Sequence, residues 1–193
     1  SIDTRLPFWG AAALSLSNFL YGLLVLPESL PERRHHRFEW KRANPIGSLL
    51  WLKDFPQVFG LAGASFLSVL AHAVFPATFV LYAAHRYGWN ERDIGFTLAF
   101  VGILSALVQG GLVRRVIPRI GERRVLLAGF VCAVLGFIGY RWAPTGPWLW
   151  AVMPVLALWG LAGPSLQSLM TCQIDPTEQG RLQGAVASMG AIA

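Results

Sequence analysis

Charged side chains are scarce in this sequence. Asp, Glu, Lys and Arg make up 13% of its 193 residues, whereas a soluble domain carries about 25%, because its surface faces water. Hydrophobic residues make up 54% of the chain, and the mean hydropathy is +0.50. The few charges stand in short blocks between long apolar runs, as in chains surrounded by lipid. The composition therefore excludes an ordinary soluble domain and predicts an integral membrane protein.

Cysteines and catalytic motifs are also scarce. The two cysteines, Cys132 and Cys172, form no metal-ligand pattern and are predicted to be small core residues. The sequence has no nucleophile elbow, zinc-protease helix or phosphate-binding loop. His35 and His36 stand in a basic segment without nearby acidic residues. We therefore expect neither a metal site nor an enzyme active site.

Most of the sequence consists of long uncharged, apolar runs. A spanning helix needs roughly 20 apolar residues, and no run alternates with the period of two that a strand requires. We therefore expect an all-α, polytopic helical bundle, of which the chain contains five spans and the start of a sixth. Because it begins at Ser1 and stops inside an apolar run at Ala193, we expect part of a longer protein. The predicted spans are 6–26, 58–84, 94–113, 125–140, a part of 142–171, and a run from 182 onward.

Glycine and proline within these runs predict irregular or closely packed helices. Pro76, Pro154 and the Gly163-Pro164 pair are expected to bend their helices, because proline removes a backbone hydrogen bond. The small residues Gly60 and Ala64, four positions apart, are expected to let two helix backbones approach closely.

Positive charges predict the orientation. Twelve of the 16 Lys and Arg residues fall in alternate connections between spans, and four fall in the others. The positive-inside rule then places connections 28–56 and 114–124 in the cytoplasm. It also explains the net charge of +6 without a nucleic-acid partner. Connection 28–56 contains Trp40 and Trp51, which suit a segment lying on the membrane surface. It is either a linker between two bundles or an ordinary basic loop.

The predicted spans contain no Asp, Glu, Lys or Arg, so this part of the protein is not expected to supply a carboxylate proton relay. His72 either binds protons or substrate, or forms a structural hydrogen bond, which is the commoner case. Ser105 and Gln109 share one helix face. Together with Gln167 they either line an aqueous cavity or join helices by hydrogen bonds. The candidate cavity residues are therefore His72, Ser105, Gln109 and Gln167.

Several segments resemble a known transporter family. Residues 119–124, RIGERR, are followed by an apolar run and resemble the cytoplasmic loop motif of the major facilitator superfamily. Segments 26–34, 86–109 and 175–188 are similar to segments of its tetracycline-type drug:proton antiporters, in the same order and at the same spacing. Pro118 stands in place of the acidic residue of the motif. Ser105 stands where tetracycline exporters can carry a histidine.

The resemblance implies a twelve-helix transporter of which this chain is about half. Residues 1–27 would be the last span of the N-terminal half, 28–56 the cytoplasmic linker and 57–193 the C-terminal bundle. The implied activity is export of small amphipathic compounds in exchange for protons, by alternating access across the bacterial cytoplasmic membrane. It would require no cofactor and would be driven by the proton gradient. Its partners would be the substrate, protons, the lipid bilayer and the N-terminal half.

The resemblance also assigns roles to the loop between the third and fourth spans. Its basic residues would contact the cytoplasmic gate and are candidates for anchoring to anionic lipid. The loop candidates are Arg119, Gly121, Arg123 and Arg124. The alternative function is a membrane scaffold of the same fold that does not transport, because the predicted spans lack charge.

Overall fold

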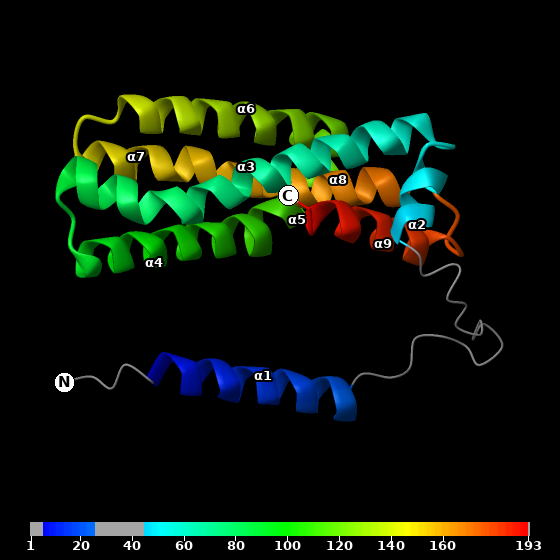
Figure 1. The fold of residues 1–193 in the computed structure, drawn as a ribbon, viewed down its shortest axis with the longest axis horizontal. Helices are drawn as coiled ribbons and strands as arrows, with labels where there is room; N and C mark the ends of the chain where they lie inside the picture. Colours follow the sequence, from blue (N-terminus) through cyan, green and yellow to red (C-terminus); the bar gives the residue numbers. More distant parts are fainter. Residues whose placement is uncertain (1–5, 26–44, 193) are drawn as a thin grey trace. The chain divides into compact units, whose positions relative to one another are not determined.

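The structure is a computed structural model, which describes residues 6–25 and 45–192. The chain divides into two compact units, residues 1–39 and residues 40–193, and each is described by itself. The described part of the first unit is helix α1 (Leu6–Leu24), which contains the apolar segment Phe8–Leu24 (Figure 1). The predicted span 6–26 is thus helical over Leu6–Leu24, but its apolar segment is shorter than a candidate span, so its crossing of the membrane stays a prediction.

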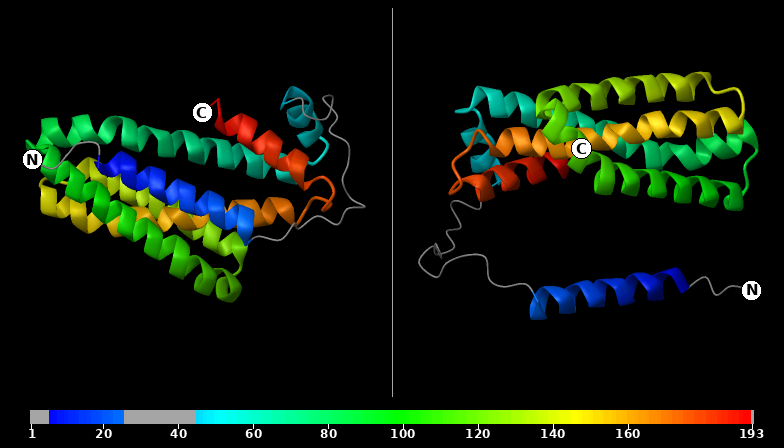
Figure 2. Two further views of the ribbon diagram at one scale, coloured as in Figure 1. Left: turned by 90° about the horizontal axis from the view of Figure 1, so that it is seen from below. Right: turned by 180° about the vertical axis from the view of Figure 1, so that it is seen from behind.

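The second unit is a bundle in which successive long helices run antiparallel (Figures 1 and 2). A π turn, Val108–Leu112, joins α4 to α5, and a 3-10 turn, Leu158–Leu161, joins α7 to α8, so each pair forms one continuous helix. The helices are α2 (Pro45–Leu52), α3 (Pro56–Tyr87), α4 (Glu91–Leu107), α5 (Val113–Ile120), α6 (Glu122–Trp142), α7 (Gly146–Ala157), α8 (Ala162–Thr171) and α9 (Gln179–Gly190).

Four continuous helices among the described residues are long and apolar enough to cross a membrane. They contain the predicted spans 58–84, 94–113 and 125–140 and most of 142–171, so these predictions are confirmed. Helix α9 corresponds to the predicted start of a sixth span. The four helices are Pro56–Tyr87, Glu91–Ile120, Glu122–Trp142 and Gly146–Thr171.

Local sequence signals set the ends of these helices. Helix α3 begins at Pro56, whose missing N–H costs nothing in the first turn. It ends at Gly88, which has a φ of 65°, a conformation that favours glycine. Helix α4 then begins with a capping box: the Asp93 backbone N–H donates to the Asn90 side chain, and the Asn90 N–H donates to the Asp93 carboxylate.

The helices are irregular at some of the predicted positions. The 3-10 turn at Leu158–Leu161 follows Pro154 by four residues. Helix α3, in contrast, continues through Pro76 as one α-helix. The π turn, which the sequence analysis did not predict, contains Gly110 and Gly111.

Helix α6 packs closely along the continuous helix α7–α8, because its glycines leave room for the neighbouring side chains. A Cβ added at Gly136 would lie 2.8 Å from Leu156 Cδ1, and one at Gly139 would lie 2.7 Å from Val152 Cγ1. A Cβ added at Gly60 would meet no atom within 4 Å among the described residues. Among the described residues, α3 therefore makes no tight backbone contact at Gly60, and the close approach predicted there stays a prediction.

Three hydrophobic clusters hold the bundle together. The largest joins α2, α3, α6, α8 and α9, and includes the fully buried residues Leu52 and Leu182. The second joins α3, α4, α6 and α7 around Leu149 and Met153, and the third lies where the two irregular turns meet. Cys132 is half-buried, but Cys172 is exposed because α8 ends at that point of the chain. The prediction that Cys172 is a core residue is therefore wrong.

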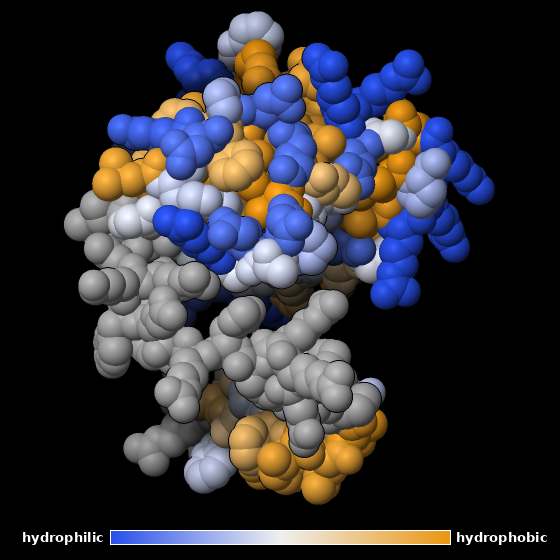
Figure 3. Space-filling model, turned by 90° about the vertical axis from the view of Figure 1, so that its right-hand side faces the viewer, coloured by the Kyte–Doolittle hydropathy of each residue, from blue (hydrophilic) through white to orange (hydrophobic). Residues whose placement is uncertain are grey.

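Basic side chains gather at the end of the bundle where α3 begins and α8 ends. Seven of the ten Lys and Arg residues in 45–192 belong to this end, and three belong to the opposite end. Figure 3 views this end and shows hydrophilic side chains projecting around it. The seven are Lys53, Arg114, Arg115, Arg119, Arg123, Arg124 and Arg181. The asymmetry matches the charge bias between predicted connections.

Part of the predicted linker is ordered on the bundle. Helix α2 packs against α9, and Leu52 is fully buried. Trp51 is half-buried against the largest cluster, which differs from the membrane-surface position expected for it. Residues 28–44, including Trp40, lie outside the described residues, so the domain limits at 27 and 56 stay predictions.

Candidate functional site

A cavity of about 310 Å³ opens among the long helices of the bundle. Three helices contribute lining residues at helical spacing, which places each set on one face. Helix α3 contributes Ser68, His72 and Phe75, and α4 with the π turn contributes Val101, Ser105 and Gln109. The helix α7–α8 contributes Met153, Ala157, Gly160 and Pro164 among others, and α6 contributes Tyr140.

The structure brings three of the four predicted cavity residues together. His72 of α3 lines the same cavity as Ser105 and Gln109, which both belong to the continuous helix Glu91–Ile120. Gln167 lies outside this lining, half-buried on α8, where its carbonyl accepts a hydrogen bond from the Thr171 hydroxyl (3.0 Å). The roles of all four stay predictions.

The two irregular turns meet at this cavity. Gln109 lies in the π turn and Gly160 in the 3-10 turn. A Cβ added at Gly160 would lie 3.9 Å from Gln109 Cγ, so the turns are near neighbours. Irregular helical turns leave some carbonyls less tightly bonded and often mark functional positions. Here they place a polar amide in a mainly apolar wall.

His72 contacts an indole ring in the same wall. Its ring centroid lies 5.2 Å from that of Trp159, and the Trp159 indole N–H donates to the Ser68 hydroxyl (3.1 Å). Trp159 is buried in the 3-10 turn, and its ring also lies edge-on to Phe137. None of the described residues that line the cavity is Asp, Glu, Lys or Arg. It offers aromatic surface, neutral hydrogen-bonding groups and one imidazole.

Part of this wall was not predicted from the sequence. Phe75 lies at helical spacing from His72, so a projection of α3 onto a wheel would have found it. Tyr140 and Trp159 join the lining only because α6 and the 3-10 turn pack beside α3, and no local pattern indicates this. Contacts between helices that are distant in sequence decide where Tyr140 and Trp159 lie.

The predicted loop residues lie at the basic end of the bundle. Gly121 alone separates α5 from α6, and its φ of 88° is a conformation that favours glycine. Its N–H donates to the Ile117 carbonyl (2.9 Å), which closes the end of α5. Arg119 precedes this turn, and Arg123 and Arg124 follow it, with all three side chains exposed. None of the four loop candidates lines the cavity.

Glu122, which follows Gly121, connects two helices. Its half-buried carboxylate accepts a hydrogen bond from the Ser168 hydroxyl, so it joins the start of α6 to α8. Residue 122 belongs to the motif-like segment 119–124 but was not among the predicted loop candidates. A charged acceptor makes this a stronger bond than a neutral pair would form.

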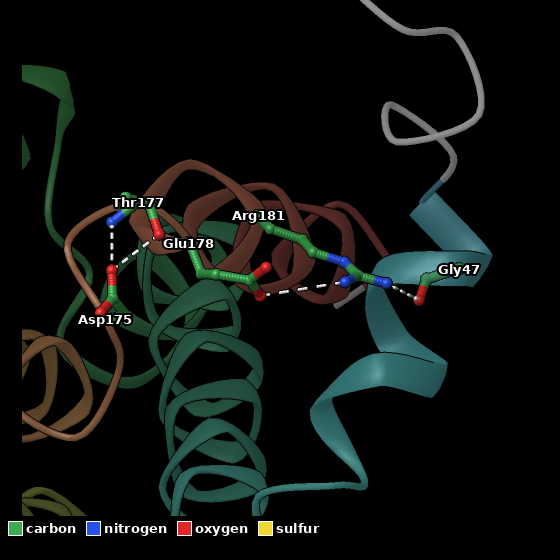
Figure 4. A network of polar contacts seen from close by, with 5 residues as sticks. All are labelled: Gly47, Asp175, Thr177, Glu178 and Arg181. Atoms are coloured by element: carbon green, nitrogen blue, oxygen red, sulfur yellow. Dashed lines mark hydrogen bonds and ion pairs between the residues drawn. The ribbon is translucent and has the colours of Figure 1, made fainter. Parts of the chain in front are cut away.

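A second polar network ties α2 to α9 at the same end (Figure 4). Arg181 of α9 donates to the Gly47 carbonyl (3.5 Å) and pairs with Glu178 (3.9 Å). Its guanidinium carbon also lies 4.8 Å from the centre of the Trp51 ring. In the turn before α9, the Thr177 hydroxyl and backbone N–H both donate to the Asp175 carboxylate (Figure 4).

The comparison with protein families decides the identity of this fold. The profile described as Major Facilitator Superfamily matches residues 1–193. The chain belongs to the Major Facilitator Superfamily. It is therefore an integral membrane protein, in agreement with its long apolar helices, and the resemblance found in the sequence is confirmed.

Curated superfamily relatives cover nearly the whole chain. It is 31% identical over 189 residues to "Tetracycline resistance protein, class C" of Escherichia coli, which covers 98% of the chain and 48% of that protein. It is 36% identical over 195 residues to "Tetracycline resistance protein, class B" of Escherichia coli, with 97% and 47% covered. It is also 26% identical over 184 residues to "Hippocampus abundant transcript-like protein 1" of Homo sapiens, with 93% and 36% covered.

The chain therefore spans about half the length of the curated tetracycline resistance proteins that it matches.

Proposed function

We propose that the protein to which this chain belongs is a secondary active transporter that exports small amphipathic compounds in exchange for protons. The observation that carries this proposal is the superfamily match over residues 1–193. Similarity to tetracycline resistance proteins at 31% and 36% identity supports drug export. The cavity supports it too, because an apolar wall with a few neutral polar groups suits amphipathic compounds.

In this proposal the cavity residues contact the transported compound. Ser105 and Gln109 supply hydrogen bonds, and the indole of Trp159 supplies aromatic surface. His72 is exposed in the cavity, where its imidazole can donate or accept a hydrogen bond and suits proton exchange. The lining lacks a carboxylate, so the carboxylates that drive proton coupling are expected in the remainder of the protein.

Alternating access would open the cavity to one side of the membrane at a time. The basic end, with Arg119, Gly121, Arg123 and Arg124, would face the cytoplasm of a bacterial inner membrane. Gly121 would hold these arginines near the gate, and their side chains would anchor to anionic headgroups. The protein's partners would be the substrate, protons, lipid and the remaining half.

The cavity favours transport over the non-transporting scaffold. A scaffold needs no polar cavity in its interior, whereas this bundle places His72, Ser105 and Gln109 in one. The transport proposal accounts for that arrangement.

The test is transport by the full-length protein in liposomes. With an imposed pH gradient, radiolabelled tetracycline should accumulate against its own gradient and move in exchange for protons. Accumulation should stop when a protonophore collapses the gradient. Gln109→Ala should raise the KM for tetracycline, because a cavity hydrogen bond is lost, whereas Gln173→Ala, in the exposed turn after α8, should not.

Equal uptake with and without the pH gradient would contradict proton coupling. Uptake no faster than in protein-free liposomes, across tetracycline and a panel of other amphipathic drugs, would contradict the transport proposal itself.

A further inference from the structure

The Trp159 indole lies against two residues of α3 at the cavity. Its N–H donates to the Ser68 hydroxyl (3.1 Å), and its ring centroid lies 5.2 Å from that of His72. Ser68 and His72 are four residues apart on α3, so they share one helix face. All three residues line the cavity of about 310 Å³. The indole, which comes from the 3-10 turn, therefore joins Ser68 and His72 into one cluster.

The hydrogen bond to Ser68 sets the orientation of the Trp159 ring. Trp159 is 8% exposed and belongs to the largest hydrophobic cluster, where Phe137 lies edge-on to it with the ring centroids 5.7 Å apart. A buried indole N–H needs an acceptor, because an unpaired donor costs free energy. The Ser68 hydroxyl is that acceptor, so it selects the orientation in which the N–H points toward α3.

The His72 imidazole is accessible in the cavity. His72 is exposed, and its ring itself lies beside the Trp159 ring, which lines the same cavity. An exposed side chain keeps its rotamer freedom unless a neighbour restrains it. The two rings are tilted by 50° at a distance that favours aromatic packing. The orientation of the imidazole therefore depends on Trp159 and, through the indole, on Ser68.

We propose that Ser68 is a positioning residue. It holds the Trp159 indole, and the indole holds the His72 imidazole in the orientation that meets the transported compound. This inference rests on the proposed transport function and concerns the specificity of the same site. The preferred compounds combine a flat conjugated ring system with a hydroxyl, carbonyl or amide group that forms a hydrogen bond with the imidazole. An imidazole that is already oriented loses little freedom on binding, so its bond contributes more to affinity.

Two rival roles for Ser68 predict different results. If Ser68 contacts the compound itself, its replacement should weaken binding whether or not the indole N–H is present. If its bond to Trp159 only stabilises the fold, its replacement should lower the melting temperature and leave the Kd and the KM unchanged. The positioning role predicts instead that the effect of Ser68 on binding depends on the indole N–H.

The test is a double-mutant cycle between Ser68 and Trp159 in the full-length protein. Ser68→Ala should raise the Kd and the KM for tetracycline about fivefold and leave kcat within about twofold, because binding to an imidazole that is no longer held is weaker. In protein that already carries Trp159→Phe, which lacks the indole N–H, Ser68→Ala should change the Kd by less than about twofold. Tetracycline is a suitable probe because its fused rings carry hydroxyl, carbonyl and amide groups.

The matched control is Ser65→Ala. Ser65 is half-buried on the same helix and is not among the described residues that line the cavity. Its replacement removes the same hydroxyl group from α3 and should leave the Kd and the KM for tetracycline within about twofold of the wild-type values.

NMR of the imidazole tests the positioning without a ligand. With isotope-labelled histidine, and with the His72 signal assigned through His72→Gln, Ser68→Ala should shift that signal, because a displaced indole changes the ring current at the imidazole. Ser65→Ala should leave the signal in place. An unchanged His72 signal in Ser68→Ala would overturn the inference, whatever the protein transports.

Kd is measured in detergent by equilibrium dialysis and KM in liposomes, so binding and transport are tested separately. An equal rise in Kd from Ser68→Ala with and without Trp159→Phe would overturn the positioning role in favour of contact between Ser68 and the compound. A lower melting temperature with unchanged Kd would overturn it in favour of a structural role. Wild-type protein that binds tetracycline without transporting it would contradict the proposed function, and the Kd would still test Ser68. Wild-type protein that binds no tetracycline would overturn the inference about Ser68 as well.

Discussion

At the scale of single residues, Gly136 shows how closely α6 packs. A Cβ at this position would lie 2.8 Å from Leu156 Cδ1 and 3.0 Å from the Leu156 Cα, which belongs to the backbone. We therefore expect Gly136→Ala to lower the free energy of unfolding by about 1–3 kcal/mol, the usual cost of overpacking. Thermal unfolding of the full-length protein in detergent measures the effect.

The matched control is Gly102→Ala on α4. A Cβ added there meets no described atom within 4 Å, so the substitution adds no clash. It should leave stability unchanged or raise it by up to about 1 kcal/mol, because alanine favours a helix interior more than glycine does. Equal melting temperatures for the two variants would contradict the close contact between α6 and α7.

Asp175 gives a prediction about pH. Hydrogen bonds from the hydroxyl and backbone N–H of Thr177 lower the pKa of the Asp175 carboxyl below its ordinary value of 3.8. Because the folded-state pKa is depressed, ionised Asp175 stabilises the turn above that value, and the contribution is lost as the pH falls through the folded-state pKa.

The test substitution at this turn is Thr177→Ala. It removes the hydroxyl and should raise the pKa of Asp175 toward its ordinary value, as an NMR titration of the carboxyl carbon would show. Thr171→Ala is the control, because the Thr171 hydroxyl donates to backbone carbonyls and not to a carboxylate. An unchanged pKa in Thr177→Ala would contradict the assigned cause.

At the scale of elements, the contact between α2 and α9 depends on Arg181. Its ion pair with Glu178 is partly exposed at 3.9 Å, so it contributes little to stability. The flat guanidinium over Trp51 and the bond to Gly47 contribute more, because both need the geometry of arginine. Arg181→Ala should therefore loosen α2.

Hydrogen–deuterium exchange of the full-length protein tests this contact. In Arg181→Ala, amides of Pro45–Leu52 should exchange about tenfold faster, while those in the middle of α6 should not change. Arg181→Lys keeps the charge but not the planar group, so it should give much of the same loss. Full protection of α2 in Arg181→Lys would show that charge alone holds the helix.

At the scale of the whole molecule, the charge asymmetry predicts the orientation. Thr177 lies in the turn before α9 at the basic end, and Thr145 lies between α6 and α7 at the opposite end. In protein whose Cys132 and Cys172 are replaced by serine, a membrane-impermeant thiol reagent outside intact cells should label Thr145→Cys and not Thr177→Cys. The reverse labelling would contradict the proposed topology.

The length of its relatives predicts that the chain depends on the remainder of the protein. It spans about half of the matched tetracycline resistance proteins, and its cavity residues line one wall of a site. Residues 1–193 expressed alone should therefore unfold in detergent without a sharp transition, whereas the full-length protein should melt cooperatively. Differential scanning calorimetry distinguishes the two. A sharp transition of residues 1–193 alone would refute this expectation.

The sequence by itself determined the class and the spans. Lipid accepts only segments whose backbone groups are bonded internally, so apolar runs near 20 residues indicate helices without knowledge of their neighbours. The helices around Val58–Ala84 and Val125–Tyr140 could be predicted for this reason. The helical spacing of Ser105 and Gln109 likewise placed both on one face before the cavity was known.

Only the tertiary structure decided which distant residues meet. Gly136 packs on Leu156, Glu122 bonds to Ser168, and Arg181 reaches Gly47 across 134 positions of the chain. The apolar pattern that marks a span is the same whether a side chain faces lipid, a neighbouring helix or the cavity. That choice depends on how the helices pack, so the places of Tyr140 and Trp159 in the cavity lining became visible only in the assembled bundle.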